Sequence, residues 1–397
     1  MNLRSEICFS ERSEDMDPFF DASHDRLRAK ARAWAEKHLQ SGHRGDVSME
    51  EEARSLVKQM GRDGLLAHTV PRRYGGARDR VHLRDICIVR EELARRSSLA
   101  DVMFAVQALA SYPIILGGTE KQKGRYLPAL AKGETIGAFA LTEPEAGSDL
   151  AAMQTRAVKH GKAYVLNGLK HLISNAGLAE TYVVFACTGP RKTKKHISAF
   201  VVEAGTAGLT LKERISLISP HPIGTLAFDD CRIPESQLIS GGGDGLRIAL
   251  ATLETLRSGV GAAAVGLAER ALEEAIGYTQ RRRQFGQPLS RFQATRFTLA
   301  DMATELAAAR GLVHQAAWSR DLGQGDVAQS SSTAKLFATE AAQRIIDHAL
   351  QLHGGLGLVS GAPVERLYRD IRALRIYEGT SEIQKIIIAR TLLGDED

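Results

Sequence analysis

The sequence lacks the cysteine pattern of a disulfide framework or a zinc site. Its 397 residues include four cysteines, and none forms a Cys-x-x-Cys pair: they are Cys8, Cys87, Cys187 and Cys231. Structural zinc sites and disulfide-rich domains need closely spaced or numerous cysteines. We therefore expect free, reduced thiols and no metal centre.

Long apolar runs and targeting signals are also missing. No apolar stretch approaches the roughly 20 residues that a transmembrane helix needs. The N-terminal segment has no apolar core and carries five acidic residues, Glu6, Glu11, Glu14, Asp15 and Asp17. That composition fits neither a secretory signal nor an acid-poor transit peptide. The expected location is the cytoplasm, with no membrane span.

An excess of charge of one sign is absent as well. Lys and Arg number 52 against 47 Asp and Glu, which leaves a formal net charge of +5. A dedicated nucleic-acid surface is therefore not expected, although local arginine clusters can still hold phosphates. Hydrophobic residues make up 44% of the chain and charged residues 25%, as in an ordinary soluble globular protein. The length is sufficient for two or three domains.

The spacing of apolar residues divides the chain into three parts after a polar arm at residues 1–20. Residues 21–135 have helical periodicity, and residues 136–240 carry short β-branched runs between turn residues. Residues 241–397 return to long helical patterns. This segregated order predicts an α+β fold, with a helical domain on each side of a β domain.

The expected elements can be given by residue range. Strands are expected at 136–141, 163–166, 181–186, 197–202, 209–213 and 224–228. Beyond them, helices are expected at 246–278, 292–322, 327–352 and 364–375, with a last helix from residue 381. The many small residues of the 246–278 helix permit close helix contacts. The basic run at 191–195 lies between two strands, and we interpret it as a solvated hairpin tip.

A carboxylate lies between two helical patterns near the C-terminus. Gly379 breaks the first pattern, and Ser381 with Gln384 predicts a capping box that begins the next helix. Glu378 then lies in a tight turn just outside a helix start, beside apolar and aromatic neighbours. Such surroundings can tune the pKa of a carboxyl group for general-base work. For a lone glutamate, however, a solvated loop position is the ordinary interpretation.

A loop with hydroxyl side chains follows the first expected strand. The run Phe139-Ala140-Leu141-Thr142-Glu143-Pro144-Glu145-Ala146-Gly147-Ser148-Asp149 ends a strand and then turns at its Pro, Gly and Ser residues. The hydroxyl groups of Thr142 and Ser148 and exposed N–H groups can converge there on carbonyl or phosphate oxygens. As chemistry alone, this indication is weak.

Two further clusters lie at helix ends. Arg281-Arg282-Arg283-Gln284-Phe285-Gly286-Gln287-Pro288 offers guanidinium groups, which can grip a pyrophosphate or complement a helix dipole. Gln351-Leu352-His353-Gly354-Gly355-Leu356-Gly357 is rich in glycine, although paired glycines often only end helices. It does not follow a strand, which disfavours a Rossmann fingerprint. We interpret His353 as structural.

In order and spacing these motifs resemble those of the acyl-CoA dehydrogenase family, over about residues 25 to 393. The resemblance implies an N-terminal helical domain, a small β barrel or sandwich, and a C-terminal domain like a four-helix bundle. It also implies FAD as cofactor, an acyl-CoA substrate, electron-transfer flavoprotein as acceptor and a homotetramer. Arg282 and the glycine cluster would lie against the FAD of a partner subunit.

The resemblance assigns roles to individual residues. Glu378 would be the catalytic base. The implied flavin-binding residues are Phe139, Leu141, Thr142, Gly147, Ser148, Leu172, Ile173, Ser174, Arg282, Phe285, Gln293, Gln351, Gly354, Gly355, Thr380 and Glu382. The implied substrate-binding residues are Ser148, Arg257, Tyr377, Glu378 and Gly379.

Two positions are informative by their identity. The segment Lys170-His171-Leu172-Ile173-Ser174-Asn175 is similar to a family segment that usually reads Lys-x-Trp-Ile-Thr-Asn. Ser174 keeps a hydroxyl group at the flavin N5 edge, whereas Leu172 replaces the Trp that packs against the isoalloxazine ring. Leu256 stands where some members place the base, so Glu378 would hold the commoner location.

The implied reaction is the α,β-dehydrogenation of a saturated acyl-CoA to the trans-2-enoyl-CoA, as in fatty acid β-oxidation. Glu378 would take the α proton while a hydride passes from Cβ to flavin N5. Two alternatives stay open. The first is an acyl-CoA oxidase or an enoyl-CoA reductase on the same scaffold, which the departure at Leu172 favours. The second is a non-catalytic protein that binds flavin or an acyl thioester.

Overall fold

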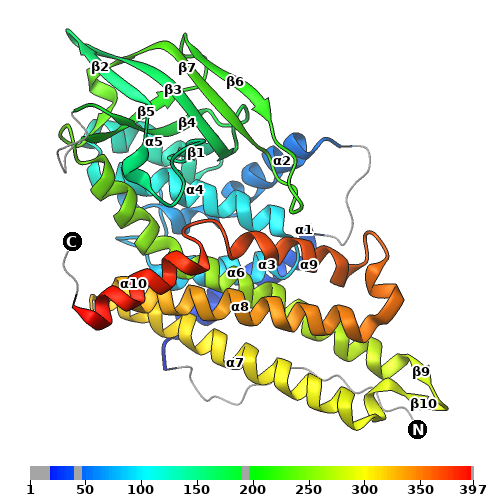
Figure 1. Ribbon diagram of the computed structural model, residues 1–397. Coiled ribbons are helices and arrows are strands. Elements are labelled where there is room, and N and C mark those ends of the chain that lie inside the picture. Colours follow the sequence, from blue (N-terminus) through cyan, green and yellow to red (C-terminus); the bar gives the residue numbers. More distant parts are fainter. Residues whose placement is uncertain (1–17, 40–46, 190–195, 395–397) are drawn as a thin grey trace.

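The computed structural model describes residues 18–39, 47–189 and 196–394. A β sheet, a set of shorter helices beneath it and a group of long helices on the far side form three layers (Figure 1). The basic run at 191–195 and most of the expected N-terminal arm fall outside the described residues. The α+β fold with helical segments on both sides of the strands is confirmed.

The N-terminal helices start at well-defined caps. They are α1 (Ala22–His38), α2 (Met49–Arg62), α3 (Leu83–Ala94), α4 (Ser98–Gly117) and α5 (Glu120–Ala131). Capping boxes begin α1, α2 and α5 at Asp21, Ser48 and Thr119. The helical pattern after residue 83 divides between α3 and α4 because the Ser97 side chain accepts the N–H of Ala100 at 3.2 Å and starts a new helix.

The strands form one mixed sheet. They are β1 (Gly137–Ala140), β2 (Arg156–His160), β3 (Ala163–Ser174), β4 (Thr181–Cys187), β5 (Ile197–Glu203), β6 (Leu209–Arg214), β7 (Ile223–Pro234) and β8 (Leu238–Ile239). Their order is β6-β7-β3-β2-β4-β5-β8, with β1 paired to β4. Both β1 and β2 run parallel to β4. Strand β2 was not expected, since Ala157 is its one buried side chain and its pattern is therefore weak.

The long helices follow the sheet. They are α6 (Gly245–Arg281), α7 (Gln293–Leu322), α8 (Val327–His353), α9 (Pro363–Leu374) and α10 (Ser381–Leu393). Small residues on α6 do permit close contacts: a Cβ atom on Gly266 would lie 2.1 Å from the Glu91 carbonyl oxygen of α3. One on Gly261 would lie 2.8 Å from Val313 on α7. Helix α6 therefore holds the N-terminal helices and the long helices together.

Two helices, α4 and α6, are long and apolar enough by length and composition to cross a membrane. The expectation that no apolar run approaches that length was therefore wrong. In both helices 78% of the most apolar window is buried inside the protein. Core helices of a globular fold behave in this way, because they are apolar on all sides. Cys87, Cys187 and Cys231 are buried and form no disulfide among the described residues, and Cys8 lies outside them.

Candidate active site

The turn between α9 and α10 carries Glu378 in an unusual backbone conformation. Glu378 has a φ of +54° and Gly379 a φ of +91°. A residue with a side chain adopts this left-handed region at a cost of roughly 1–2 kcal/mol. The surrounding structure must therefore hold the turn in place, and such strain is often found at functional sites.

Helix α10 begins one residue earlier than the capping box predicts. Thr380 is the N-cap residue, and its side chain accepts the N–H of Ile383 at 3.4 Å. The expected pairing of Ser381 with Gln384 was wrong. Ser381 Oγ instead donates to Glu340 Oε1 at 2.6 Å, and Gln384 Nε2 donates to the Gly379 carbonyl at 2.8 Å. Both contacts fix the turn against its neighbours.

Lys335 of α8 supports the same turn from inside the protein. Its side chain is buried, and Nζ donates to the Tyr377 carbonyl at 2.6 Å and to the Gly379 carbonyl. Burial lowers the pKa of Lys335 to about 7. A neutral amine still has two N–H donors, one for each carbonyl. The main chain on both sides of Glu378 is therefore held whether or not Lys335 is charged.

The Glu378 carboxylate is buried beside positive charges without a direct partner. Its side chain is 8% exposed, and Arg90 Nη1 lies 4.0 Å from Oε1. Oε2 is buried and accepts no hydrogen bond from any residue that the structure describes. Burial raises the pKa of Glu378, while Arg90, Lys335 and Arg257 act to lower it. A carboxylate whose pKa is raised in this way is suited to take up a proton.

An ion pair that the motifs do not indicate lies directly beside Glu378. Arg90 of α3 donates from Nε to Asp101 Oδ1 at 2.8 Å and from Nη2 to Oδ2 at 3.0 Å, and both side chains are buried. A sequence signal did exist, because Arg90 interrupts an apolar run of α3 that carries two more charges, Glu91 and Glu92. Charged residues on a buried helix face need partners, which marks them for attention.

The expected substrate contacts Arg257 and Tyr377 lie near Glu378. Arg257 is 6% exposed, and its Nη1 donates to Ser332 Oγ at 3.1 Å. Its Nε is buried and has no hydrogen-bond partner among the described residues. Tyr377 packs against the core, and burial raises the pKa of its hydroxyl group. The two residues and Gly379 therefore gather around the carboxylate.

The loop after β1 is anchored by a buried ion pair. Lys170 Nζ donates to Glu143 Oε1 at 2.7 Å and to the Leu141 carbonyl at 2.9 Å. Burial lowers the pKa of Lys170 to about 8. Around this anchor, Phe139 contacts Phe185 with ring centroids 5.0 Å apart, Leu141 is buried and Thr142 is half-buried, while Gly147 and Ser148 are exposed.

The end of β3 lies beside that loop, because the His171 N–H donates to the Thr142 carbonyl at 2.9 Å. Leu172 is 45% exposed with a φ of +54°, where the register of β3 against β7 shifts. Ile173 is buried. Ser174 Oγ lies 3.1 Å from His221 Nε2, and burial lowers the pKa of His221. The structure thus brings two distant motifs together at one edge of the sheet.

Six of the expected flavin contacts lie elsewhere, in what we call the distal cluster: Arg282, Phe285, Gln293, Gln351, Gly354 and Gly355. The hairpin of β9 (Arg283–Gln284) and β10 (Gln287–Pro288) lies far from the sheet in Figure 1. Phe285 in this hairpin is 93% exposed. Stacking of Tyr278 on His353 at 4.3 Å joins the ends of α6 and α8, which fits a structural role for His353.

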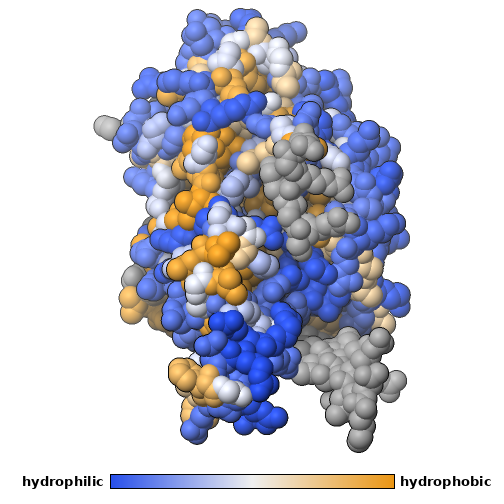
Figure 2. Space-filling view, turned by 90° about the vertical axis from the view of Figure 1, so that its right-hand side faces the viewer, coloured by the Kyte–Doolittle hydropathy of each residue, from blue (hydrophilic) through white to orange (hydrophobic). Residues whose placement is uncertain are grey.

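All six residues of the distal cluster are exposed, and the β9–β10 hairpin lies far from β3 in Figure 1. Figure 2 shows the side of the molecule that carries the hairpin: a largely hydrophilic surface with separate apolar patches. Exposed guanidinium groups such as that of Arg282 suit a pyrophosphate. At the sheet edge, exposed Leu172 beside the Ser174 and Thr142 hydroxyls offers the apolar and hydrogen-bonding mixture that a flavin ring needs. The residues present therefore fit FAD.

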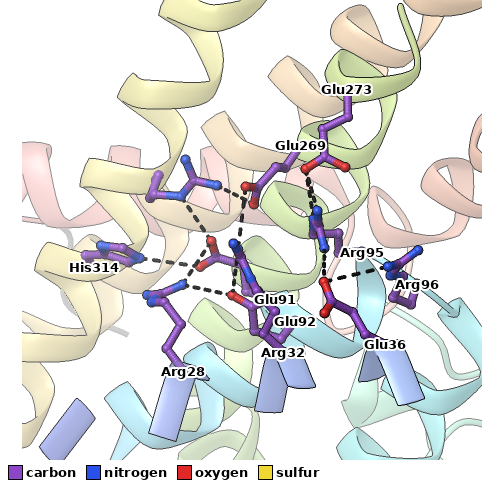
Figure 3. A network of polar contacts seen from close by, with 11 residues as sticks. Arg28, Arg32, Glu36, Glu91, Glu92, Arg95, Arg96, Glu269, Glu273 and His314 are labelled. Carbon is purple, nitrogen blue, oxygen red and sulfur yellow. Dashed lines mark hydrogen bonds and ion pairs between the residues drawn. The ribbon is translucent and has the colours of Figure 1, made fainter. Parts of the chain in front are cut away.

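A second charge cluster surrounds Glu91 and Glu92 of α3 (Figure 3). Glu92 accepts from Arg32 of α1 at 2.9 and 3.1 Å, and Glu91 accepts from Arg310 of α7 at 3.0 Å. Arg310 also donates to Glu269 of α6 at 2.8 Å. We call these residues, with Arg28 and His314, the α3 network. It links α1, α3, α6 and α7.

Comparisons with known proteins agree along the chain. Family models described as acyl-CoA dehydrogenase N-terminal, middle and C-terminal domains match residues 21–134, 138–231 and 243–393. The "Acyl-CoA dehydrogenase" of Bacillus subtilis (strain 168) is 41% identical over 93% of this chain and 97% of its own length.

Two further relatives extend the comparison. The "Acryloyl-CoA reductase (NADH)" of Anaerotignum propionicum is 38% identical over 96% of this chain and 98% of its own length. The solved structure of butyryl-CoA dehydrogenase from Megasphaera elsdenii is 34% identical with a TM-score of 0.89. The match covers 94% of this chain and 99% of that one.

Proposed function

The chain belongs to the acyl-CoA dehydrogenase family, an FAD-dependent family of enzymes, and we propose that it oxidises a saturated acyl-CoA to the trans-2-enoyl-CoA. The observation that carries this proposal is the state of Glu378. Its carboxylate is buried, its pKa is raised, and Oε2 accepts no hydrogen bond from the residues described. A structural carboxylate would be paired in such a position.

Glu378 takes the Cα proton of the acyl thioester in the proposed reaction. The Cα proton is weakly acidic, so donors to the thioester oxygen must stabilise the developing negative charge, and the Glu378 N–H is the donor that this chain offers. FAD, when bound, supplies the acceptor for the hydride that leaves Cβ. Lys335 and Gln384 hold the carbonyls that flank Glu378, which keeps the carboxylate and the N–H in fixed relation.

The remaining roles are part of the same proposal. Arg257, Tyr377, Gly379 and Ser148 would contact the substrate. Phe139, Leu141, Thr142, Gly147, Ser148, Leu172, Ile173, Ser174, Thr380 and Glu382 would contact the FAD of the same subunit. The distal cluster would contact the FAD of a partner subunit, which requires at least a dimer and fits a homotetramer. Electron-transfer flavoprotein would accept the electrons in the cytoplasm, as in fatty acid β-oxidation.

The test uses the visible spectrum of the FAD-loaded protein under anaerobic conditions. Addition of an acyl-CoA should bleach the flavin absorbance of the unmodified enzyme. Glu378→Gln should bind the same acyl-CoA yet reduce the flavin about 100-fold to 10,000-fold more slowly, since general-base catalysis contributes that much. Glu305→Gln, at a surface pair with Arg344, is the matched control and should bleach normally. Full activity in Glu378→Gln would refute the assignment of the base.

A second candidate function is the reverse reaction, reduction of an enoyl-CoA. It is favoured by the 38% identity to a protein named acryloyl-CoA reductase (NADH) and by Leu172 at a position that is usually Trp. Reduced enzyme mixed anaerobically with an enoyl-CoA should recover its flavin absorbance if this direction operates. Oxygen consumption with acyl-CoA and no added acceptor would instead identify an oxidase. Bound flavin that no thioester alters would identify a binding protein.

A further inference from the structure

The Arg90–Asp101 pair occupies the space beside the proposed base. Its two hydrogen bonds, at 2.8 and 3.0 Å, join α3 to α4, and both side chains are at most 3% exposed. Arg90 Nη1 is 4.0 Å from Glu378 Oε1. Two heavy atoms in van der Waals contact are already about 3.5–4.0 Å apart. No methylene group can therefore pass between the guanidinium and the carboxylate.

Helix α6 closes the other side of this pair. A Cβ atom on Gly259 would lie 3.1 Å from Arg90 Cδ and 3.2 Å from Nη1. Arg90 is thus packed directly against the backbone of α6, and Gly259 is the residue that makes room for it. Ile86 of α3 lies at the same place, 3.4 Å from that Cβ position. The region between α3, α4 and α6 is filled at the level of Glu378.

In the proposed reaction the acyl chain lies beside the Glu378 carboxylate, whose nearest charged side chain is that of Arg90. Lys335 and Gln384 contact the main-chain carbonyls of the turn and hold Glu378 in this position. Beyond Cβ, a long alkyl chain would meet Arg90. Moving Arg90 would leave Asp101 buried and unpaired, which is strongly unfavourable. An alkyl chain gives no hydrogen bond in return.

We propose that the Arg90–Asp101 pair ends the acyl cavity directly beyond Glu378, so that the substrate is a short-chain acyl thioester of the propionyl or butyryl class. This inference rests on the proposed function. It assigns Arg90 and Asp101 to substrate specificity and gives them no part in the proton transfer.

The experiment is anaerobic flavin reduction with butyryl-, hexanoyl-, octanoyl- and palmitoyl-CoA. The unmodified enzyme should be reduced most efficiently by butyryl-CoA. The rate constant of flavin reduction divided by the dissociation constant should be at least about tenfold lower for octanoyl-CoA, which corresponds to about 1.4 kcal/mol. Arg90→Met with Asp101→Leu removes both charges together and should move the preference toward longer chains. Arg344→Met with Glu305→Leu removes an exposed ion pair between α8 and α7 and should leave the preference unchanged.

The outcomes separate the two proposals. Bleaching that is most efficient with octanoyl- or palmitoyl-CoA would overturn the chain-length inference and leave the proposed function standing. Flavin that no acyl-CoA bleaches would overturn the proposed function. Calorimetric binding of the same panel to Glu378→Gln then decides the chain-length inference without turnover: tighter binding of octanoyl-CoA than of butyryl-CoA would refute it. If the double variant does not fold, the unmodified enzyme and Glu378→Gln still give the answer.

Discussion

Helix α3 carries three consecutive buried charges that face two different surroundings. Arg90 lies beside Glu378, whereas Glu91 and Glu92 point into the α3 network of Figure 3. Glu91 and Glu378 are both buried carboxylates, yet their pKa values shift in opposite directions. Burial acts to raise both, but Arg28 and Arg310 hold the pKa of Glu91 well below its usual range. For Glu378, burial prevails.

Distance explains the difference. Arg310 Nε lies 3.0 Å from Glu91 Oε1, within hydrogen-bond range, whereas Arg90 Nη1 stays 4.0 Å from Glu378 Oε1 because its other nitrogens bond Asp101. Glu91, which accepts from Arg310 and lies beside Arg28, therefore resists protonation. A carboxylate held just outside such a pair remains available for a proton. The two sites therefore show a structural use and a proposed catalytic use of the same residue type.

The comparison predicts its largest effect at Glu91. Glu91→Gln leaves Arg28, Arg310 and His314 without their shared anion, and breaking a buried pair costs about 3–5 kcal/mol. Denaturant unfolding should show that loss, while flavin reduction by a bound acyl-CoA keeps its rate. Glu274→Gln, at a half-exposed pair with Arg270, should cost less than about 1 kcal/mol. Equal losses in both variants would remove the distinction.

Lys335 should connect stability to catalysis. Lys335→Met removes two hydrogen bonds to the carbonyls around Glu378, each contributing about 0.5–1.5 kcal/mol. We expect flavin reduction to slow by about 10-fold to 100-fold, because each 1.4 kcal/mol is a factor of ten. Lys335→Gln keeps N–H donors and should recover part of the rate. An unchanged rate of flavin reduction in Lys335→Met would mean that the turn keeps its conformation without the Lys335 hydrogen bonds.

The pH dependence of stability tests the protonation state of the same residue. Lys335 has a pKa of about 7 in the folded protein against 10.5 as its ordinary value. Between these values the unfolded chain binds the extra proton, so Lys335 makes stability rise with pH, by at most about 1.4 kcal/mol per unit. The free energy of unfolding of the unmodified protein minus that of Lys335→Met should rise across this window. A flat difference would show that Lys335 stays charged.

The smallest expected effect concerns the backbone of the turn. Gly379→Ala forces a Cβ onto a φ of +91°, 2.7 Å from Gln384 Nε2, and should cost about 1 kcal/mol or more in stability. Gly205→Ala has a similar φ of +79° on a loop with nothing within 4 Å. Both should lower the melting temperature slightly, but only Gly379→Ala should slow flavin reduction. Equal rates of flavin reduction in the two variants would show that the backbone strain of this turn is not needed for the reaction.

Local patterns predicted the fold and the location of the candidate base. The helix ranges from residue 246 onward lie close to those observed, because each has a long apolar period and a clear end. Strand β2 was not predicted, because it buries only one side chain and so shows no alternation of apolar residues. The sequence did not predict Arg90, Asp101 and Lys335 as part of the site for another reason. They come from three helices, and only the tertiary fold brings them to Glu378.

The motif residues of the sheet edge and of the distal cluster illustrate the same limit. His171 and Thr142 meet because β3 runs beside the loop after β1, an arrangement that strand order decides. Nothing in the sequence places the β9–β10 hairpin relative to β3, and the two elements lie far apart in Figure 1. The flavin contacts assigned to both groups remain predictions.

The order of the charged residues on α3 also fixes the rotation of this helix about its axis. An α-helix turns by about 100° per residue. Deleting one residue before Arg90 would rotate the helix by that angle and carry Glu91 toward Glu378, anion against anion. The same deletion would place Leu93 where Glu92 now accepts from Arg32, so Arg32 would lose its carboxylate partner. A shift of one residue would therefore destabilise the fold at two places. The order Arg-Glu-Glu thus favours a single alignment of α3 against its neighbours.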